Sequence, residues 1–417
     1  MNVLTHVNPA SVASPAAAVR RVVIALGAVA LVLGMAVAFG HPDAGGAVPR
    51  IPTDPSEILE YATGGVGDSA GRERAALRRK LDRDPRDLAL AVALAKLDIE
   101  ASRREGDPRF LGRAQAALTP WWNEPSPPSD VLLLRATIRQ SLHDFGSATA
   151  DLDLLLAKSP NNVQAWLTRS VVLGVRGEYA AARESCAPLS ALAGELVANA
   201  CTAPIESLTG HAREAYDRLA LTLDRTRREG ERGWLLSILG EIAIRMGDDG
   251  AAERHLTRAL EATPSEAYTQ AALADLLLDL RRPLEVVGRL RGHENDDNLL
   301  LRLVIAELAV KDAAAAAHAE MLASKHAASR ERGDVVHRRE QARFELEVRR
   351  NPHAALELAR ANWEVQKEPA DARVFLESAL AARDPRAASP VVEFLTANRT
   401  EEPRLVALVA RARAGSP

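Results

Sequence analysis

The chain repeats a pattern of apolar and polar positions that predicts pairs of amphipathic helices. Trp166, Ser170 and Leu173 lie at positions i, i+4 and i+7, which form one stripe of a helix. Gly177 then interrupts the pattern. The second stripe consists of Tyr179, Ala182 and Cys186. Because Pro160 stands just before this unit, the pattern predicts a helix, a tight turn and a second helix.

The same unit recurs along most of the chain. Alanines in equivalent places, Ala148, Ala182, Ala215 and Ala252, are spaced 34, 33 and 37 residues apart. A repeated two-helix unit cannot bury its apolar face alone, so the units are expected to stack. The predicted units lie near residues 85–122, 129–160, 163–192, 196–228, 233–264, 267–293, 298–332, 335–368 and 371–398. A last helix over Glu402–Ala414, within residues 399–417, is predicted to cap the array.

This pattern resembles the tetratricopeptide repeat family. The resemblance rests on a large residue (Trp166), a small residue four positions later (Ser170), the turn at Gly177 and a closing proline such as Pro264. It implies an all-α fold, a right-handed superhelical solenoid of antiparallel helix pairs within residues 71–398. No unit carries every signature residue, and the unit at 196–223 has Pro204 inside its first helix.

The resemblance also implies a concave groove that binds proteins or peptides. In this family, first-helix side chains that do not pack into the core line the groove. On this chain those positions are Gln164, Leu167, Val171, Trp234, Glu241, Arg245, Tyr268, Asp275, His337, Glu340 and Phe344. Trp234 and Tyr268 occupy equivalent positions and either anchor a peptide or seal the core between repeats. No first helix carries the Lys/Asn/Lys/Arg clamp of the chaperone-binding members.

The amino terminus predicts export of the body. Val22–Phe39 is an uncharged apolar run of 18 residues, preceded by Arg20-Arg21. As a helix it would extend about 27 Å, enough to cross a bilayer core. Residues 1–40 are therefore either an uncleaved inner-membrane signal anchor or a signal peptide cleaved after Ala38, with release to the periplasm. Residues 41–70 form a Pro/Gly-rich linker.

Composition and charge narrow the function classes. The 417 residues include 53 basic and 56 acidic side chains, a net charge of −3, which argues against nucleic acid as the partner. No phosphate-binding loop, metalloprotease helix or nucleophile elbow is present in the sequence. We therefore expect no catalytic residues, cofactor or metal. His318 and His326 could share a helix face but lack nearby carboxylates, so we interpret them as solvated.

Three smaller features of the sequence concern local structure, and two of them allow two alternatives each. Cys186 and Cys201 fall on neighbouring helices, where they form either a disulfide or two separate buried thiols. Trp121-Trp122, within the proline-rich insertion 118–130, is either a plug over the first repeats or an exposed docking knob. The cluster 337–344 is predicted to be a solvated face with internal salt bridges.

Together these features predict a non-catalytic scaffold in a bacterial cell envelope that binds partner proteins or peptides in its groove. The alternative is an accessory subunit of an envelope enzyme complex that senses a small ligand, glycan or peptide. An enzyme would have to use pairs such as Glu241 with Arg245 or His337 with Glu340, and an open solenoid excludes water poorly.

Overall fold

The computed structural model describes residues 69–105, 109–331 and 336–415, and this part of the chain is helical without strands. Ser69 and Ala70, assigned to the linker from sequence, form the start of the first helix. The apolar run Val22–Phe39, its cleavage site and the remainder of the linker lie outside the described residues. Within the described ranges, no helix combines the length and the apolar character needed to span a bilayer.

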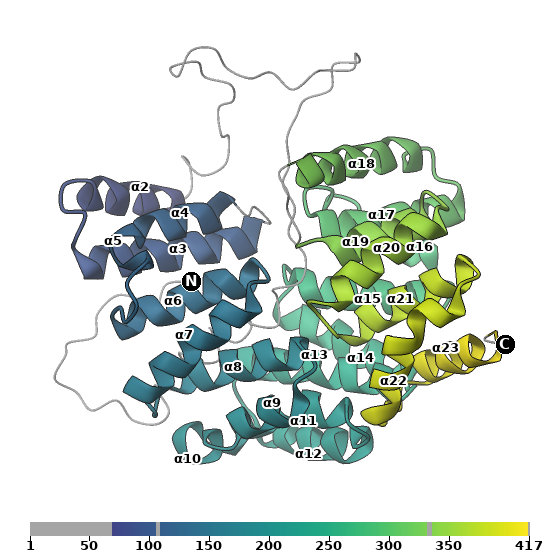
Figure 1. Ribbon diagram of the computed structural model, residues 1–417, viewed down its shortest axis with the longest axis horizontal. Coiled ribbons are helices and arrows are strands. Elements are labelled where there is room, and N and C mark those ends of the chain that lie inside the picture. The colour runs from purple at the N-terminus through teal and green to yellow at the C-terminus, as the bar shows by residue number, and fades with distance from the viewer. Residues whose placement is uncertain (1–68, 106–108, 332–335, 416–417) are drawn as a thin grey trace, which may run out of the picture.

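The helices follow one another as antiparallel pairs (Figure 1). In chain order they are α2 (Ser69–Leu81), α3 (Leu88–Glu105), α4 (Arg109–Ala117), α5 (Thr119–Trp122), α6 (Ser129–Ser141), α7 (Phe145–Lys158), α8 (Val163–Val175), α9 (Tyr179–Cys186), α10 (Leu189–Ala193), α11 (Glu195–Ser207), α12 (Ala212–Arg225), α13 (Glu229–Arg245), α14 (Asp249–Ala262), α15 (Ala267–Asp279), α16 (Pro283–Leu290), α17 (Asp297–Val310), α18 (Ala315–Glu331), α19 (Arg338–Glu347), α20 (Pro352–Trp363), α21 (Pro369–Ala381), η1 (Pro385–Ala388), α22 (Ser389–Ala397) and α23 (Pro403–Ala414).

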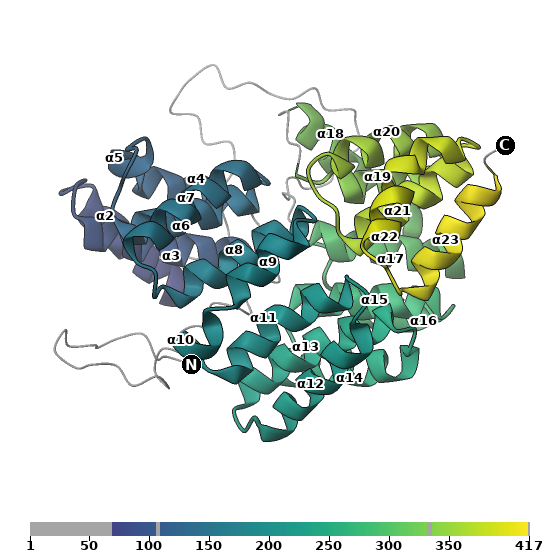
Figure 2. The same ribbon diagram turned by 60° about the horizontal axis from the view of Figure 1, so that its bottom comes forward.

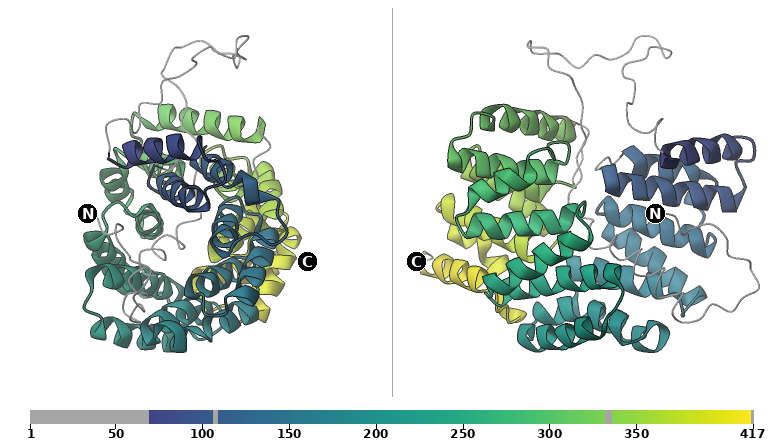
Figure 3. Two further views of the ribbon diagram at one scale, coloured as in Figure 1. Left: turned by 90° about the vertical axis from the view of Figure 1, so that its left-hand side faces the viewer. Right: turned by 180° about the vertical axis from the view of Figure 1, so that it is seen from behind.

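First helices of successive pairs pack side by side and make the array continuous. The series α3, α6, α8, α11, α13, α15, α17, α19 and α21 is in contact from each member to the next. Figure 3 shows that the array follows a curved path rather than a straight stack. First helices therefore form a continuous layer along the curve, as the helix-pair pattern predicts.

The predicted stripes supply the core of each pair. Ser170, Leu173 and Cys186 are at most 3% exposed, and the repeated alanine Ala182 is fully buried. Small residues at these positions allow close approach of the two helices of a pair. The prediction of amphipathic helix pairs is confirmed.

The turns between paired helices share one left-handed residue. Gly177, Gly210 and Gly247 have φ of 79°, 81° and 73°, whereas non-glycine residues with φ between 56° and 59° fill the same place in other pairs. Those residues are His143, Arg281, Lys311, Arg350 and Arg383. Except after Arg350, the residue that follows donates its N–H to a carbonyl five positions back, as in Glu178 to Leu173. Left-handed backbone therefore does not by itself require glycine in these turns.

The carboxyl-terminal segment lies across the three glycine turns and closes the curve. A Cβ on Gly177 would lie 2.7 Å from the Phe394 ring, and one on Gly247 would lie 2.8 Å from Pro403. The Lys367 N–H donates to the Val175 carbonyl at 2.7 Å, and the Ala212 N–H donates to a Glu401 carboxylate oxygen at 3.0 Å. Figure 2 shows these carboxyl-terminal helices beside α13–α15. The glycines therefore stand where another part of the chain approaches the turn.

The final helix α23 is not a free cap at the end of the array. It packs on α21, and Arg404 forms ion pairs with Asp249 at 2.9 Å and with Asp279 at 3.1 Å. The predicted helix exists, but it contacts pairs far back along the chain because the array curves around to meet it.

In the structure Cys186 and Cys201 are bonded, with an S–S distance of 2.02 Å and a Cα–Cα distance of 5.7 Å. The bond joins the end of α9 to α11, and Ser170 Oγ lies 3.2 Å from the Cys186 sulfur. The structure therefore has the disulfide and not the two separate buried thiols that the sequence also allowed.

We expect reduction of this bond to lower the free energy of unfolding by about 3 kcal/mol, because a loop of 15 residues is released in the unfolded state. Urea unfolding with and without dithiothreitol measures the change. The double variant with alanine at both cysteines should not respond to the reductant. Two alkylatable thiols in the oxidised, unfolded protein would contradict the bridge.

Trp121 and Trp122 pack against the apolar core formed by α2, α3, α4 and α6. The Trp122 ring also lies 5.8 Å from the Arg139 guanidinium, and its carbonyl accepts a hydrogen bond from Arg135. The pair is half-buried on α5, which matches the plug rather than the exposed docking knob.

Candidate functional site

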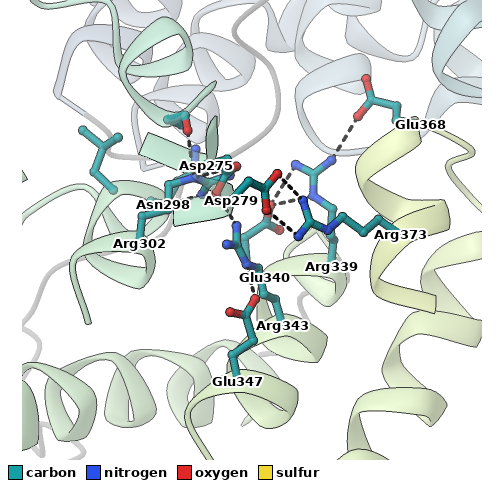
Figure 4. Close-up of polar contacts among 12 residues, drawn as sticks. Asp275, Asp279, Asn298, Arg302, Arg339, Glu340, Arg343, Glu347, Glu368 and Arg373 are labelled. Carbon is teal, nitrogen blue, oxygen red and sulfur yellow. Dashed lines mark hydrogen bonds and ion pairs between the residues drawn. The ribbon is translucent and has the colours of Figure 1, made fainter. Parts of the chain in front are cut away.

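A charged cavity lies on the concave side of the layer of first helices, in the second half of the array. Its volume is about 210 Å³, and α13, α15, α17, α19 and α21 supply its walls together with Glu402, which precedes α23. Figure 4 shows the guanidinium and carboxylate groups of these helices pointing toward one another. The titratable groups of this lining are carboxylates, arginines and Tyr268.

Asp275 on α15 is bound by two arginines from two other helices. Arg302 on α17 donates to one carboxylate oxygen at 2.6 Å, and Arg343 on α19 donates to the other at 2.6 Å. Burial alone would raise the pKa of Asp275, but the two guanidinium charges outweigh it and hold the pKa below its usual range. Asp275 therefore stays ionised and ties three repeats together.

Arg339 on α19 organises a second cluster. It contacts Glu340 at 2.8 Å and Glu368 at 3.0 Å, and it lies 3.5 Å from Asp371. Burial of Glu340 is outweighed by Arg339 and His337, which hold its pKa at about 2. By contrast, burial and the nearby charge of Asp371 raise the pKa of Glu368, and burial raises the pKa of Asp371, both despite Arg339. One guanidinium therefore faces three carboxylates.

Arg373 on α21 connects the cavity to the closing contacts of the carboxyl terminus. It binds both oxygens of Asp279, at 2.7 and 2.8 Å, and also Glu377 at 2.9 Å. Asp279 in turn pairs with Arg404 of α23. Bidentate guanidinium–carboxylate pairs fix geometry as well as charge, so they hold the cavity walls in register.

A third cluster in the cavity consists of Glu241, Arg245 and Tyr268. Arg245 donates to Glu241 at 3.0 Å and to the Ser207 hydroxyl at 2.7 Å. Burial, followed by the nearby charges of Glu241 and Glu368, raises the pKa of Tyr268 well above its ordinary value. The phenol therefore remains a neutral hydrogen-bonding group.

Glu266, immediately before α15, carries a carboxylate oxygen that is buried without a hydrogen-bond partner among the described residues. Burial raises its pKa from 4.5 to about 7. Its charge therefore destabilises the fold: the cost from this group is absent below pH 4.5, grows as the pH rises to about 7 and is constant above that.

Replacing Glu266 with glutamine should remove this dependence and raise the unfolding free energy at pH 8 by about 1–2 kcal/mol, with almost no gain at pH 4.5. Urea unfolding at both pH values measures it. Glu261→Gln, an exposed residue on α14, is the control. Equal effects of Glu266→Gln at the two pH values would contradict the buried-charge explanation.

The cavity brings together five of the positions predicted to line a groove. They are Glu241, Arg245, Tyr268, Asp275 and Glu340. Gln164, Val171, Trp234 and His337 do not line it. Trp234 is half-buried between the core of α8–α11 and the core of α11–α13. This place matches a side chain that seals the core between repeats and not one that anchors a peptide.

Leu167 and Phe344, also predicted to line the groove, lie in the core. Each is 2% exposed and lies in a core cluster, and Phe344 packs edge-on against His326. Phe344 follows the cavity residue Arg343 directly, so it is turned by about 100° around the helix axis, toward the core. A one-residue difference in helix phase separates the two environments.

Two further interpretations are corrected by burial. The cluster 337–344 is salt-bridged but not solvated, since Arg339 and Glu340 are 9% and 8% exposed. His326 is 3% exposed, and His318 Nδ1 lies 2.9 Å from a Glu307 carboxylate oxygen. Arg339, Glu340 and His318 therefore contact other charged side chains, whereas His326 packs against the Phe344 ring. Among the described residues, no group of three or more His, Cys, Asp or Glu is placed to hold a metal ion.

Five charged residues of the cavity are not among the groove positions predicted from the sequence: Arg302, Arg339, Arg343, Arg373 and Glu402. A usable signal was present, because Asp275 and Asp279, Arg339 and Arg343, and Arg373 and Glu377 are each spaced i, i+4 on a first helix. Side chains at that spacing share the face that borders the concave side. Glu402 had no such signal, since it precedes a helix that folds back from the end of the chain.

Comparisons with known proteins find likeness in three-dimensional structure and not in sequence. No protein-family model matches the chain, and no curated protein matches it. A tetratricopeptide repeat protein from Parabacteroides merdae is 15% identical over 61% of this chain and 93% of its own, with a TM-score of 0.37. Yeast Tom70 is 12% identical over 82% of this chain and 96% of its own, with a TM-score of 0.35. A human IFIT1 dimer with PPP-AAAA is 11% identical over 84% and 87%, with a TM-score of 0.44.

Proposed function

We propose that the chain is a non-catalytic binding scaffold whose concave cavity receives a positively charged segment of a partner protein. The observation that carries this proposal is the charge of the lining. Eight carboxylates face only five arginines there. A cavity with excess negative charge favours cationic groups and repels acidic or phosphorylated ones.

Helical-repeat geometry supports binding over catalysis. The lining comes from first helices of five consecutive pairs, so one side chain that enters the cavity meets groups from five repeats. Its ionised groups are mostly engaged in ion pairs with each other. They therefore offer charge recognition rather than a free acid, base or nucleophile.

The bacterial envelope location is part of the same proposal. Two features support it, the apolar run Val22–Phe39 behind Arg20-Arg21 and the disulfide between Cys186 and Cys201. In this view the amino-terminal segment is an anchor or a cleaved signal, and the helical array works outside the cytoplasm. A periplasm-dependent reporter fused at the carboxyl end should be active, and activity only of a cytosol-dependent reporter would refute export.

Site-specific photo-crosslinking in the full-length protein tests the binding proposal. A photoreactive amino acid at Ala272, which lines the cavity, should form a defined adduct with a partner in cells. The matched control places the same amino acid at Glu214, an exposed position on the second helix α12. Adducts from Glu214 and none from Ala272 would show that partners bind elsewhere.

A further inference from the structure

Glu402 is a buried carboxylate in the cavity without a partner of its own. It is 8% exposed and borders the cavity just ahead of α23. Its side chain does not cap that helix, and it makes no hydrogen bond or ion pair with the described residues. An ionised carboxylate in such a place is costly unless a cation approaches it.

The groups that face Glu402 come from four helices, and each cation among them is already engaged. Arg245 of α13 binds Glu241, Arg373 of α21 binds Asp279 and Glu377, and Arg404 of α23 binds Asp249 and Asp279. The fourth group is Asp279 itself, on α15, which adds negative charge. Glu402 is therefore the carboxylate that remains after these arginines have been paired.

The size of the cavity limits what can reach it. At about 210 Å³ it is smaller than the roughly 300–1,000 Å³ of sites for drug-sized ligands. It accommodates one side-chain group and not a folded segment. A compact ammonium on a flexible alkyl chain fits this space better than a planar guanidinium, which needs a fork of aligned acceptors.

We propose that Glu402 is the acceptor for a single alkylammonium group, supplied by a lysine of the partner segment or by a free polyamine. This inference rests on the proposed function and specifies the ligand chemistry of the same cavity. The ammonium donates hydrogen bonds to the Glu402 carboxylate and removes the unpaired charge.

A proton should leave the site when the ligand binds. Burial raises the pKa of Glu402 despite Arg245, Arg373 and Arg404, so protonation of this carboxyl group competes with ligand binding as the pH falls. The arriving ammonium stabilises the ionised form, and the proton goes to the buffer. Affinity should therefore rise as the pH increases from 5 to 8 and fall with added salt.

Calorimetric titration of the full-length protein tests the inference with three probes. They are spermidine, a short lysine-containing peptide and the same peptide acetylated on its lysine. We expect binding of at least one ammonium probe, no binding of the acetylated peptide, and proton release measured in two buffers of different ionisation enthalpy. Stronger binding of spermidine or of the lysine peptide identifies the source.

The variant Glu402→Gln should weaken ammonium binding about tenfold, since one charged acceptor is lost. Glu377→Gln is the matched control, because Glu377 lines the same cavity but is already paired with Arg373, and it should change affinity less than about threefold. Circular dichroism checks that both variants fold. If Glu402→Gln does not fold, the difference in affinity between the lysine peptide and its acetylated form in the wild-type protein decides.

Equal affinities of wild type and Glu402→Gln, or the absence of binding by every ammonium probe, would overturn the inference. The two proposals fail in different ways. If crosslinking from Ala272 is unchanged by Glu402→Gln, the scaffold proposal is kept and the ammonium site is rejected. Glu402-dependent spermidine binding without any Ala272 adduct retains the ammonium site and rejects the protein partner.

Discussion

Replacing Gly177 with alanine should lower the free energy of unfolding by about 2–4 kcal/mol and loosen the closure between the middle and the end of the array. Part of the cost is backbone strain, because Gly177 has a φ of 79°. The larger part is a collision, since the new Cβ would lie 2.7 Å from the Phe394 ring. Phe394 cannot move freely, as it packs against Tyr179 and Trp363. Urea unfolding measures the loss.

Gly292→Ala separates strain from collision. Gly292 also has a positive φ, 96°, but a Cβ there would meet nothing within 4 Å. It should cost only about 1 kcal/mol. Small-angle scattering should show an increased radius of gyration for Gly177→Ala and an unchanged one for Gly292→Ala. Equal destabilisation by the two variants would show that the contact with Phe394 contributes nothing.

The glycine turns show which part of the fold could be predicted from sequence. Helix pairs could be predicted because their stripes repeat locally, as at Ser170, Leu173 and Ala182. The closure could not, because the contact between Tyr179 and Lys367 joins residues 188 positions apart and has no periodic pattern. The sequence carried one sign of the closure: the turns that the carboxyl-terminal segment approaches have glycine (Gly177, Gly210 and Gly247), whereas the turns of other pairs have larger residues in the same place.

The candidate site was predictable to a similar degree. Helix phase placed Glu241, Tyr268 and Asp275 on the concave side, because a first helix presents the same face throughout the array. Arg339 and Glu340 were assigned to a solvated face, because polarity alone does not distinguish a face toward water from a face toward another polar helix. That distinction depends on how tightly the array curves, which is a property of the stacked pairs and not of one of them.

Asp275→Ala should be the most damaging single change in the cavity, with a loss of about 2–3 kcal/mol. It leaves the guanidiniums of Arg302 and Arg343 without their shared carboxylate, and their side chains are 9% and 16% exposed. A fully buried charge would lose more, but the Asp275 side chain is 30% exposed, so solvent screens part of the effect. Urea unfolding at pH 7 measures the loss.

The matched control for Asp275 is Glu347→Ala. Glu347 also binds Arg343 at 2.6 Å and is also 30% exposed, but the pair lies at i, i+4 on one helix, and within the part of the chain that the structure describes Glu347 forms no ion pair with another helix. It should cost less than about 1 kcal/mol. Adding Arg302→Met to Asp275→Ala should recover part of the stability, because the buried Arg302 keeps only neutral partners once Asp275 is gone, and the double variant removes it. If the double variant were as unstable as the sum of the two single changes, Asp275 would not be acting through its arginines, and the cavity would not be held together by charge.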